Sequence, residues 1–495
     1  MSASSALGAS LLLPLLGAVG VMLTGKRPNL RDSVTLLAAL ATAWLVYQLI
    51  PFAQQSSPPR VNAFFVLPGV RIAFALEPLG MLYACVASGL WVLTSVYAIG
   101  YMRSHHEQNQ TRFFTCFALS IFAALGIAFA ANLFTLFLFY EALTLCTYPL
   151  VTHHGTHEAQ RAGRVYLGLL LTTSIVGLLF AVLWTWHLTG TLEFRAGGIL
   201  SGHVQPEVAG VLLALYAFGT GKAALMPFHR WLPNAMVAPT PVSALLHAVA
   251  VVKAGVFTIL KVVVYVFGLD FLRGAEIGTW LCYVASFTLL VASAIAITQD
   301  NLKARLAYST ISHLAYIVLG AAIAAPASVL GGGLHIAMHA VAKITLFFCA
   351  GAIYVTAHKT KVSELNGLGR QMPFTMTAFF LASLSLIGLP PFGGVWSKWY
   401  LALGAGQANQ HLFIFVLMAS SLLSIAYLMP VVARAFFFAA SSPTSGHHTP
   451  VAARFKEAPL LCLVPLCLTA IGSFLLFFFA EPVYELLLPI VREAQ

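Results

Sequence analysis

The sequence predicts an all-α membrane protein that crosses the bilayer many times. Hydrophobic residues make up 60% of its 495 residues and charged residues only 8%, whereas soluble domains carry about 25% charged residues. The mean hydropathy is +0.88. The apolar runs are about 20 residues long, which is the length of a transmembrane helix and not the ~10 residues of an outer-membrane β-strand.

The apolar runs divide into about fourteen transmembrane segments, two of which are broken by glycine and proline. We expect these segments near residues 5–24, 33–52, 79–102, 112–130, 132–151, 162–188, 208–238 (broken), 241–269, 276–298, 303–323, 328–356, 373–404 (broken), 411–440 and 458–480. The connections are short and leave no room for a soluble domain. The N-terminus lacks the basic stretch of a cleavable signal peptide, so we expect the first helix to be retained.

Basic residues are distributed unevenly between the two sets of loops. Fifteen of the 26 Lys and Arg residues fall in loops after odd-numbered segments, five in the other loops and tails, and six inside segments. Cytoplasmic loops of membrane proteins are enriched in Lys and Arg. We therefore expect a bacterial-type inner-membrane protein whose termini both lie on the non-cytoplasmic side. The net charge of +11 then reflects topology, and we expect no nucleic-acid partner.

The two broken segments each carry a lysine. Residues 216–233 surround Lys222 with two glycines and two prolines, and residues 388–398 precede Lys398 with three glycines and two prolines. Proline interrupts the helical hydrogen-bond ladder, and irregular backbone at membrane depth is tolerated only inside protein or beside a water-filled cavity. Paired broken segments indicate an inverted-repeat transporter with its site at the breaks. The alternative is that both are kinks that serve packing alone.

Charged residues inside the segments indicate an ion or proton path, because charge at bilayer depth costs ~2.5–3.5 kcal/mol per group on insertion scales. The buried basic residues are Lys222, Arg230, Lys253, Lys261, Lys343 and Lys398. Glu141 is the one clearly intramembrane acid, and a lysine on another helix would keep it ionised. A fixed interhelical salt bridge is the alternative for Glu141. Lys261 lies near enough to a helix end to serve only as an anchor.

Histidines add groups that exchange protons near neutral pH. His335, His339 and Lys343 repeat at four-residue intervals and form one stripe on a helix, and His247 lies six residues before Lys253. A polar packing seam is the alternative for this stripe, and it explains Ser309, His313 and Tyr316 equally well. We expect no metal site, because the third member of the stripe is lysine and the seven cysteines form no cluster. The histidines at 153, 154 and 157 are expected on a solvated surface.

The chain resembles the antiporter-like subunits shared by respiratory complex I, Mrp-type Na⁺/H⁺ antiporters and membrane-bound hydrogenases, and looks most similar to the D-type subunits of Mrp antiporters. The resemblance is carried by residues 97–101, 112–114, 221–248, 299–312 and 335–351 and covers at least residues 72–405. It implies two inverted five-helix repeats. We therefore expect N-terminal helices at 1–111, a first repeat at 112–269, a second repeat at 276–440 and a C-terminal helix within 441–495.

The resemblance also implies roles for individual residues in a proton relay. Glu141 and Lys222 would form the glutamate–lysine pair of the first half-channel, and Lys253 would be the central link. The polar axis of the second repeat would consist of His335, His339 and Lys343, and Lys398 would end it. Glu77 stands where the family often has aspartate, and its role is left open.

We therefore expect an ion-translocating subunit that moves H⁺, with or without exchange for Na⁺, beside other membrane subunits of an inner-membrane complex. The alternatives are a proton-pumping subunit of a complex I-like or hydrogenase complex, an energy-coupling membrane subunit of inorganic-carbon uptake, and a non-transporting scaffold. The chain carries no redox cofactor motif, so we expect no cofactor and no electron transfer in this subunit. An enzyme acting on lipid or quinone would need a nucleophile or cofactor site that the sequence does not offer.

Overall fold

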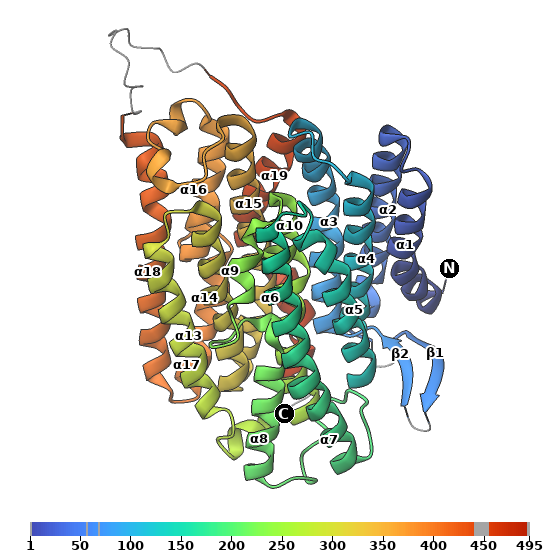
Figure 1. The fold of residues 1–495 in the computed structure, drawn as a ribbon. Helices are drawn as coiled ribbons and strands as arrows, with labels where there is room; N and C mark the ends of the chain where they lie inside the picture. The colour runs from blue at the N-terminus through green and yellow to red at the C-terminus, as the bar shows by residue number, and fades with distance from the viewer. Residues whose placement is uncertain (1, 56–57, 68–69, 440–454, 493–495) are drawn as a thin grey trace, which may run out of the picture.

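The computed structural model describes residues 2–55, 58–67, 70–439 and 455–492. Long helices run side by side in one bundle, with a β-hairpin beside its lower end (Figure 1). Within the described residues, twelve helices are long and apolar enough to cross a membrane. Two shorter apolar helices, α8 (Pro206–Gly219) and α16 (Pro373–Ile387), begin the segments that the sequence predicts to be broken. The chain is therefore a multi-pass, all-α membrane protein, as the sequence predicts.

A two-stranded sheet interrupts the N-terminal helices. The elements of this part are α1 (Ala3–Leu23), α2 (Pro28–Leu49), η1 (Ile50–Phe52), β1 (Arg60–Leu67), β2 (Val70–Ala75) and α3 (Pro78–Ser104). The strands are antiparallel, with Arg60 opposite Ala75. The backbone N–H of Ala75 also donates to Phe129 O at 2.8 Å, which ties the sheet to the end of the fourth transmembrane helix. From the sequence, we expect only a loop between the second and third transmembrane segments.

Two of the next three spans start at side-chain caps that their sequences supply. These spans comprise α4 (Gln110–Ala128), α5 (Leu133–Val151), α6 (His157–Thr173), η2 (Ser174–Leu179) and α7 (Phe180–Thr189). Asn132 accepts a hydrogen bond from the backbone of Thr135 at 2.8 Å, and Thr156 accepts one from Ala159 at 3.2 Å. Such side-chain oxygens satisfy the free backbone donors at a helix start. The π-helical turn η2 joins α6 and α7 into one long span.

Both predicted breaks are present in the structure. After α8, the chain passes through η3 (Gly221–Ala223), α9 (Trp231–Asn234) and η4 (Ala235–Val237), and after α16 it resumes as α17 (Gly394–Gln407). The Met226–Pro227 and Pro390–Pro391 peptide bonds within the breaks are cis. The assignment of two inverted repeats to residues 112–269 and 276–440 stays a prediction.

The remaining helices complete the bundle. They are α10 (Thr240–Ala244), η5 (Leu245–Val249), α11 (Val251–Val262), η6 (Val263–Phe267), α12 (Leu269–Gly274), α13 (Thr279–Thr298), α14 (Leu302–Ile323), α15 (Pro326–Ala357), η7 (Val362–Glu364), η8 (Leu368–Arg370), α18 (His411–Phe437), α19 (Leu460–Phe478), α20 (Glu481–Leu487) and α21 (Pro489–Arg492). The predicted boundary at 440–441 lies outside the described residues.

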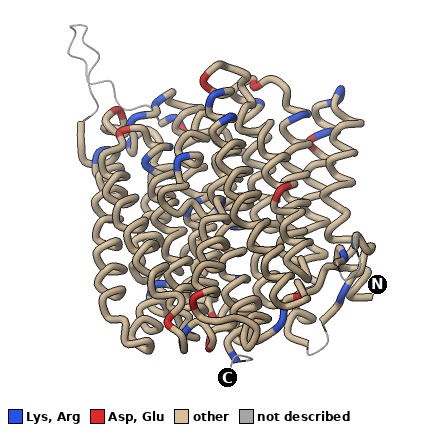
Figure 2. The backbone as a smooth tube through the Cα atoms, turned by 60° about the horizontal axis from the view of Figure 1, so that its bottom comes forward, with Lys and Arg blue, Asp and Glu red and all other residues tan. Residues whose placement is uncertain are grey.

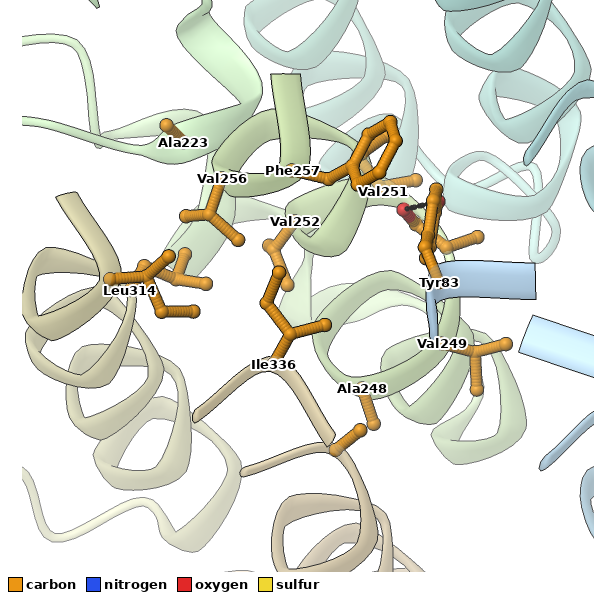
Figure 3. Packing of buried hydrophobic residues seen from close by; sticks show 14 of the residues in the cluster. Tyr83, Ala223, Ala248, Val249, Val251, Val252, Val256, Phe257, Leu314 and Ile336 are labelled. Carbon is orange, nitrogen blue, oxygen red and sulfur yellow. Dashed lines mark hydrogen bonds between the residues drawn. The ribbon is translucent and has the colours of Figure 1, made fainter. Parts of the chain in front are cut away.

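The span from α10 to η6 lies at the centre of the bundle. Its most apolar stretch is fully buried, whereas only 28% of the corresponding stretch of α2 is buried. Figure 3 shows Val252 and Phe257 of α11 among Leu314 of α14, Ile336 of α15 and Tyr83 of α3. Because other helices surround this span on all sides, its polar side chains can contact only other protein groups or enclosed water.

Gly255 brings the first break directly against α11. A Cβ at this position would overlap the backbone of Lys222 and Ala223. The absence of a side chain therefore lets the irregular chain at the break lie on the helix surface. This close approach places Lys222 and Lys253 on two backbones that touch.

The charged residues are concentrated at the ends of the helices. In Figure 2, blue Lys and Arg segments lie along the upper end of the bundle, and a few lie in its middle. In Figure 1, the C marker lies near the lower end of the bundle and the N marker lies beside α1 at about mid-height. This arrangement agrees with the distribution of basic residues between loops, while the orientation in the membrane stays a prediction.

Candidate functional site

Four of the six basic residues expected inside the bundle are completely buried. The exposed fraction is 0% for Lys222, Lys253, Lys261 and Lys343, and Lys398 is half-buried. Arg230, which was also expected inside, is exposed. It follows the cis bond at Met226–Pro227 in the first break, where the chain leaves the helical path and turns the guanidinium outward. Arg230 is therefore not a buried group.

Lys222 is held by one turn of α5. Its Nζ donates to Tyr140 O at 2.8 Å and to Thr144 Oγ1 at 2.5 Å, and it lies 3.3 Å from the centre of the Tyr140 ring. The Lys222 backbone N–H donates to the Tyr140 hydroxyl at 3.0 Å. A carbonyl, a hydroxyl and a π-face together stabilise an ammonium group that has left water. The break thus fixes this lysine at a defined point.

Glu141 is next to this site but is not bonded to Lys222 in the structure. Both of its carboxylate oxygens are shielded from solvent and accept no hydrogen bond, and no ion pair among the described residues includes it. Glu141 is nevertheless the charged group with the strongest electrostatic effect on Lys222. Glu141 and Lys222, expected to form a pair, are therefore neighbours without a direct bond, and the functional role of the pair stays a prediction.

A file of stacked rings leads away from Lys253. Lys253 Nζ lies 2.6 Å from His339 Nδ1, and the His339 ring lies 5.2 Å from the ring of His313. His313 in turn stacks on His335 at 5.3 Å between ring centres, with an interplanar angle of 4°. Three helices, α11, α14 and α15, supply these side chains. The file joins groups that are 86 residues apart in sequence.

The hydrogen bonds of the file set where protons lie in the neutral rings. Ser397 Oγ donates to Gly394 O at 3.0 Å, so it accepts from His335 Nδ1–H at 2.8 Å. His335 Nε2 then accepts from His313 Nδ1–H at 3.1 Å. Across the described residues, His313 Nε2 and His339 Nε2 have no hydrogen-bond partner. Transfer between these two rings therefore needs a water molecule or a ring rotation.

Lys398 closes the file at the second break. Its Nζ donates to Ile387 O at 2.8 Å and to Ser421 Oγ at 2.9 Å, and it lies 5.1 Å from the Tyr316 ring. Ile387 is the last residue of α16, so the ammonium binds a carbonyl that the helix leaves free, at the negative end of its dipole. The neighbouring residue Ser397 contacts His335. The second break is thus joined to the histidine file.

Lys343 points to a separate set of hydroxyl groups. Its Nζ donates to Ser309 Oγ at 2.8 Å, and Ser309 Oγ donates to the Tyr427 hydroxyl at 3.0 Å. Ser424 Oγ lies 2.9 Å from the same hydroxyl. The predicted stripe of His335, His339 and Lys343 therefore divides, with the histidines in the file and the lysine facing α14 and α18.

His247 is buried without a polar partner. Neither ring nitrogen has a hydrogen bond to a described residue, and the ring lies 4.6 Å from that of Phe347. The charged groups that act on it are Lys343 and Lys303. An unpartnered buried imidazole is costly, so a water molecule between His247 and these lysines would satisfy it.

Lys261 has a partner that sequence spacing does not reveal. Its Nζ lies 2.5 Å from Glu77 Oε1 and donates to Ala130 O at 2.8 Å. It is fully buried, so it does not extend to the membrane surface as a simple anchor would. Glu77 precedes α3 and belongs to a pocket of 230 Å³ at the hairpin end of the bundle.

Sequence reasoning left His313, Ser397, Ser421 and Tyr427 unassigned, although the structure places them at the centre of these contacts. The available signal was the placement of Ser309, His313 and Tyr316 on one face of a predicted helix. In the part of the chain that the structure describes, no group of three or more His, Cys, Asp or Glu residues is arranged to hold a metal ion.

The fold and the site together define a class of protein, a multi-pass membrane subunit with a buried chain of lysines and histidines. The family model described as "NADH:quinone oxidoreductase/Mrp antiporter, TM" matches residues 130–424, which is more than half of the chain. The chain belongs to this family, as its sequence motifs indicate.

Curated relatives agree with this assignment. The chain is 33% identical over 428 residues to the N subunit of NADH-quinone oxidoreductase from Desulforudis audaxviator, covering 84% of each chain. It is 31% identical to the A/B subunit of a probable K⁺/H⁺ antiporter from Rhizobium meliloti, covering 81% of this chain but only 40% of that longer protein. A chain in the Mrp complex from Dietzia sp. has the same fold, with a TM-score of 0.87 at 23% identity, over 100% of this chain and 97% of that one.

Proposed function

We propose that this chain is an ion-translocating subunit of a multisubunit membrane complex and that it moves protons along its buried side chains. The observation that carries the proposal is the file from Lys253 through His339, His313 and His335 to Ser397 and Lys398. A charged lysine can donate hydrogen bonds but cannot accept them, whereas a neutral imidazole does both. A file of imidazoles between two lysines supports proton transfer more directly than fixed packing.

The proposed relay has a role for each of the buried groups that the sequence singles out. Glu141 and Lys222 form the first half of the path, His247 and Lys253 the centre, and His335, His339, Lys343 and Lys398 the second half. A charge that moves in the first half changes the field at Lys253, and such fields act strongly in a low-dielectric interior. Movement of α11 can carry the same signal, because Gly255 holds it against the backbone of Lys222.

The relatives suggest the setting in which this relay works. One belongs to NADH-quinone oxidoreductase and another to a probable K⁺/H⁺ antiporter. We propose that other membrane subunits surround this chain in a bacterial inner membrane and that H⁺ moves with or without exchange for Na⁺ or K⁺. Antiport is distinguished from redox-driven pumping by adding Na⁺ or K⁺ to energised everted vesicles, since only antiport dissipates the pH gradient in response.

Neutralising Lys253 tests transport against a purely structural role. We expect Lys253→Met to assemble into the complex and to lose proton flux, because the file then lacks its first proton carrier. Lys26→Met, at an exposed position, is the matched control and should transport normally. Assembly is measured on native gels and flux with a pH-sensitive dye in vesicles. A Lys253→Met complex that transports normally would refute the relay, and loss of assembly alone would support the scaffold.

The proposed orientation is tested with single cysteines. Cysteine at position 363, in the loop after α15, should react from the cytoplasmic side, and cysteine at position 2 from the opposite side. Both positions are exposed. The native cysteines must first be replaced with serine or alanine. Reaction of both sites from one side would overturn the proposed topology.

A further inference from the structure

Three histidines converge on one carboxylate at the end of the bundle that we propose faces the cytoplasm. Glu107 lies in the loop after α3, and its carboxylate oxygens are 4.0 Å from His105, 3.9 Å from His153 and 3.7 Å from His154. We call these four residues the Glu107 cluster. The Glu107 side chain is only 9% exposed. His153 is buried as well, so the expectation of a solvated histidine surface is wrong for this residue.

Two loops from different helices build the cluster. His105 caps the C-terminus of α3, whereas His153 and His154 follow α5. Arg112 of α4 fixes the second loop by donating to His153 O at 2.9 Å. The cluster is therefore a defined arrangement of four titratable groups and not a chance grouping on a mobile surface.

A cavity connects the Glu107 cluster with the central helices. Its volume is 410 Å³, and its lining includes His105, Glu107 and His154 on one side and Thr240, Lys303 and Ala350 on the other. The volume is sufficient for on the order of ten water molecules. Both the Glu107 cluster and the central helices contribute polar groups to this lining, so water can bind along it.

The helices that line the far side of the cavity lead to the relay. Thr240 starts α10, and His247 lies seven residues further on the same span, which is about 10 Å at 1.5 Å per residue. Lys303 lies on α14 six residues before Ser309, the partner of Lys343. The ring of Phe347, one helical turn before Ala350 on α15, covers His247. Measured along these helices, the cavity therefore lies about 10 Å from His247 and about 10 Å from Lys343.

We propose that the Glu107 cluster is a proton-collecting site, which exchanges protons between the surrounding solution and the buried relay through this cavity. The inference rests on the proposed function and adds a site at its entrance. A carboxylate next to imidazoles captures protons from dilute solution and passes them on, because an imidazole in its ordinary range changes charge between about pH 5 and 8.

The surroundings of His153 favour its uncharged form. Burial, with smaller contributions from the neighbouring Arg112 and His154, lowers the pKa of His153 to about 4. Its ring is thus uncharged near neutral pH and carries a proton only briefly. The other titratable groups that face the cluster or line the cavity are Tyr101, Arg112, Glu158, Lys303, Tyr354 and Lys359.

The alternative is that the cluster only clamps two loops together. The two roles differ in their dependence on pH, because collection of protons limits turnover only when protons are scarce. We expect Glu107→Gln to lower proton uptake about tenfold near pH 8.5 and less than about twofold near pH 6.5. Glu107→Asp keeps a carboxylate and should retain most of the uptake at both pH values.

The experiment uses the assembled complex in everted vesicles, whose cytoplasmic face is outside. A diffusion potential, negative inside, drives uptake, and the external pH is varied. Imidazole is added outside as a mobile proton carrier and should restore the alkaline uptake of Glu107→Gln. His157→Gln, which changes an exposed histidine nearby, should match the wild type throughout.

The outcomes separate this inference from the proposed function. Equal loss of uptake by Glu107→Gln at every pH, without an effect of imidazole, would establish a clamp and overturn the proton-collecting role. Normal uptake at alkaline pH would overturn it as well. Absence of proton uptake in wild-type vesicles that contain the assembled complex would instead overturn the proposed function, together with the inference that rests on it.

Discussion

The two breaks have the same sequence signature and hold their lysines with the same kinds of group, but only the second lies beside imidazoles. At the first, the partners of Lys222 among the described residues are a carbonyl, a hydroxyl and a ring of α5, all from Tyr140 and Thr144. At the second, Lys398 is also held by a carbonyl, a hydroxyl and a ring, those of Ile387, Ser421 and Tyr316. That ring, however, stacks on His313 and His335, and the neighbouring Ser397 hydrogen-bonds to His335. Oxygen acceptors of this kind hold a proton donor but do not take its proton, whereas imidazole does. A lysine at a break therefore becomes part of a relay only through what lies beside it.

The comparison predicts that Lys253 and Lys398 must release protons. Arginine keeps the charge but does not deprotonate, so Lys253→Arg and Lys398→Arg should assemble and lose about 100-fold or more in turnover. Lys261→Arg, outside the file, should retain most of it. Flux in everted vesicles is measured with assembly checked in parallel. Normal transport by both file variants would mean that these lysines are fixed charges.

At the first break, the proposed relay relies on Glu141, because no imidazole of the described residues bonds to Lys222. We expect Glu141→Gln to lose transport at least about tenfold and Glu141→Asp to keep part of it. Thr144→Val removes one hydrogen bond to the charged lysine, worth ~1.5–3 kcal/mol, and should have the smaller effect. If Thr144→Val were the more damaging variant, the hydroxyl contact and not the carboxylate would determine transport at this break.

Lys261, which is buried but lies outside the histidine file, tests whether burial alone gives a lysine a role in transport. Lys261 pairs with Glu77, so Lys261→Met or Glu77→Gln should destabilise the protein by ~3–5 kcal/mol, since each leaves a charge without its partner. The double variant should recover part of this loss. Thermal stability in detergent is the measurement, with flux per assembled complex expected near the wild-type value. A large loss of flux without loss of stability would place Lys261 in the relay.

The smallest expected effect concerns His153, outside the membrane-spanning segments. Its pKa is about 4 in the folded chain and ~6.5 in an unfolded one. Between these values only the unfolded chain binds the proton, so stability is unaffected above about pH 6.5 and falls by ~1–3 kcal/mol as the pH decreases toward 4. His153→Gln should weaken this acid sensitivity in melting curves recorded from neutral pH downward, and His157→Gln should not. Identical curves for all three proteins would contradict the burial of an uncharged His153.

The fold can be predicted from the sequence because hydropathy and proline are local signals. Runs of apolar residues define the spans, and Pro227, Pro390 and Pro391 mark the breaks regardless of what packs there. The contacts of the site are tertiary, and no spacing rule gives them. Lys253 meets His339 across 86 residues, and Lys261 meets Glu77 from another span.

Two further differences have physical explanations. The hairpin of residues 60–75 is held partly by backbone bonds to residues 129–131, which the strand sequences do not reveal. The direct bond expected between Glu141 and Lys222 is replaced by bonds to Tyr140 and Thr144, one and three residues away. A rotation of one helix by a fraction of a turn decides between these partners, and sequence spacing does not fix that rotation.

Gly255 has a consequence for how the protein can vary over evolutionary time. Contact between α11 and the first break is made by backbone atoms on one side and a missing side chain on the other. Substitutions elsewhere can therefore alter the chemistry of either lysine while the two remain mechanically joined. Any side chain at position 255, in contrast, would overlap the backbone of Lys222 and Ala223 and push the first break away from α11. The contact between α11 and the first break therefore tolerates most substitutions but not one at Gly255.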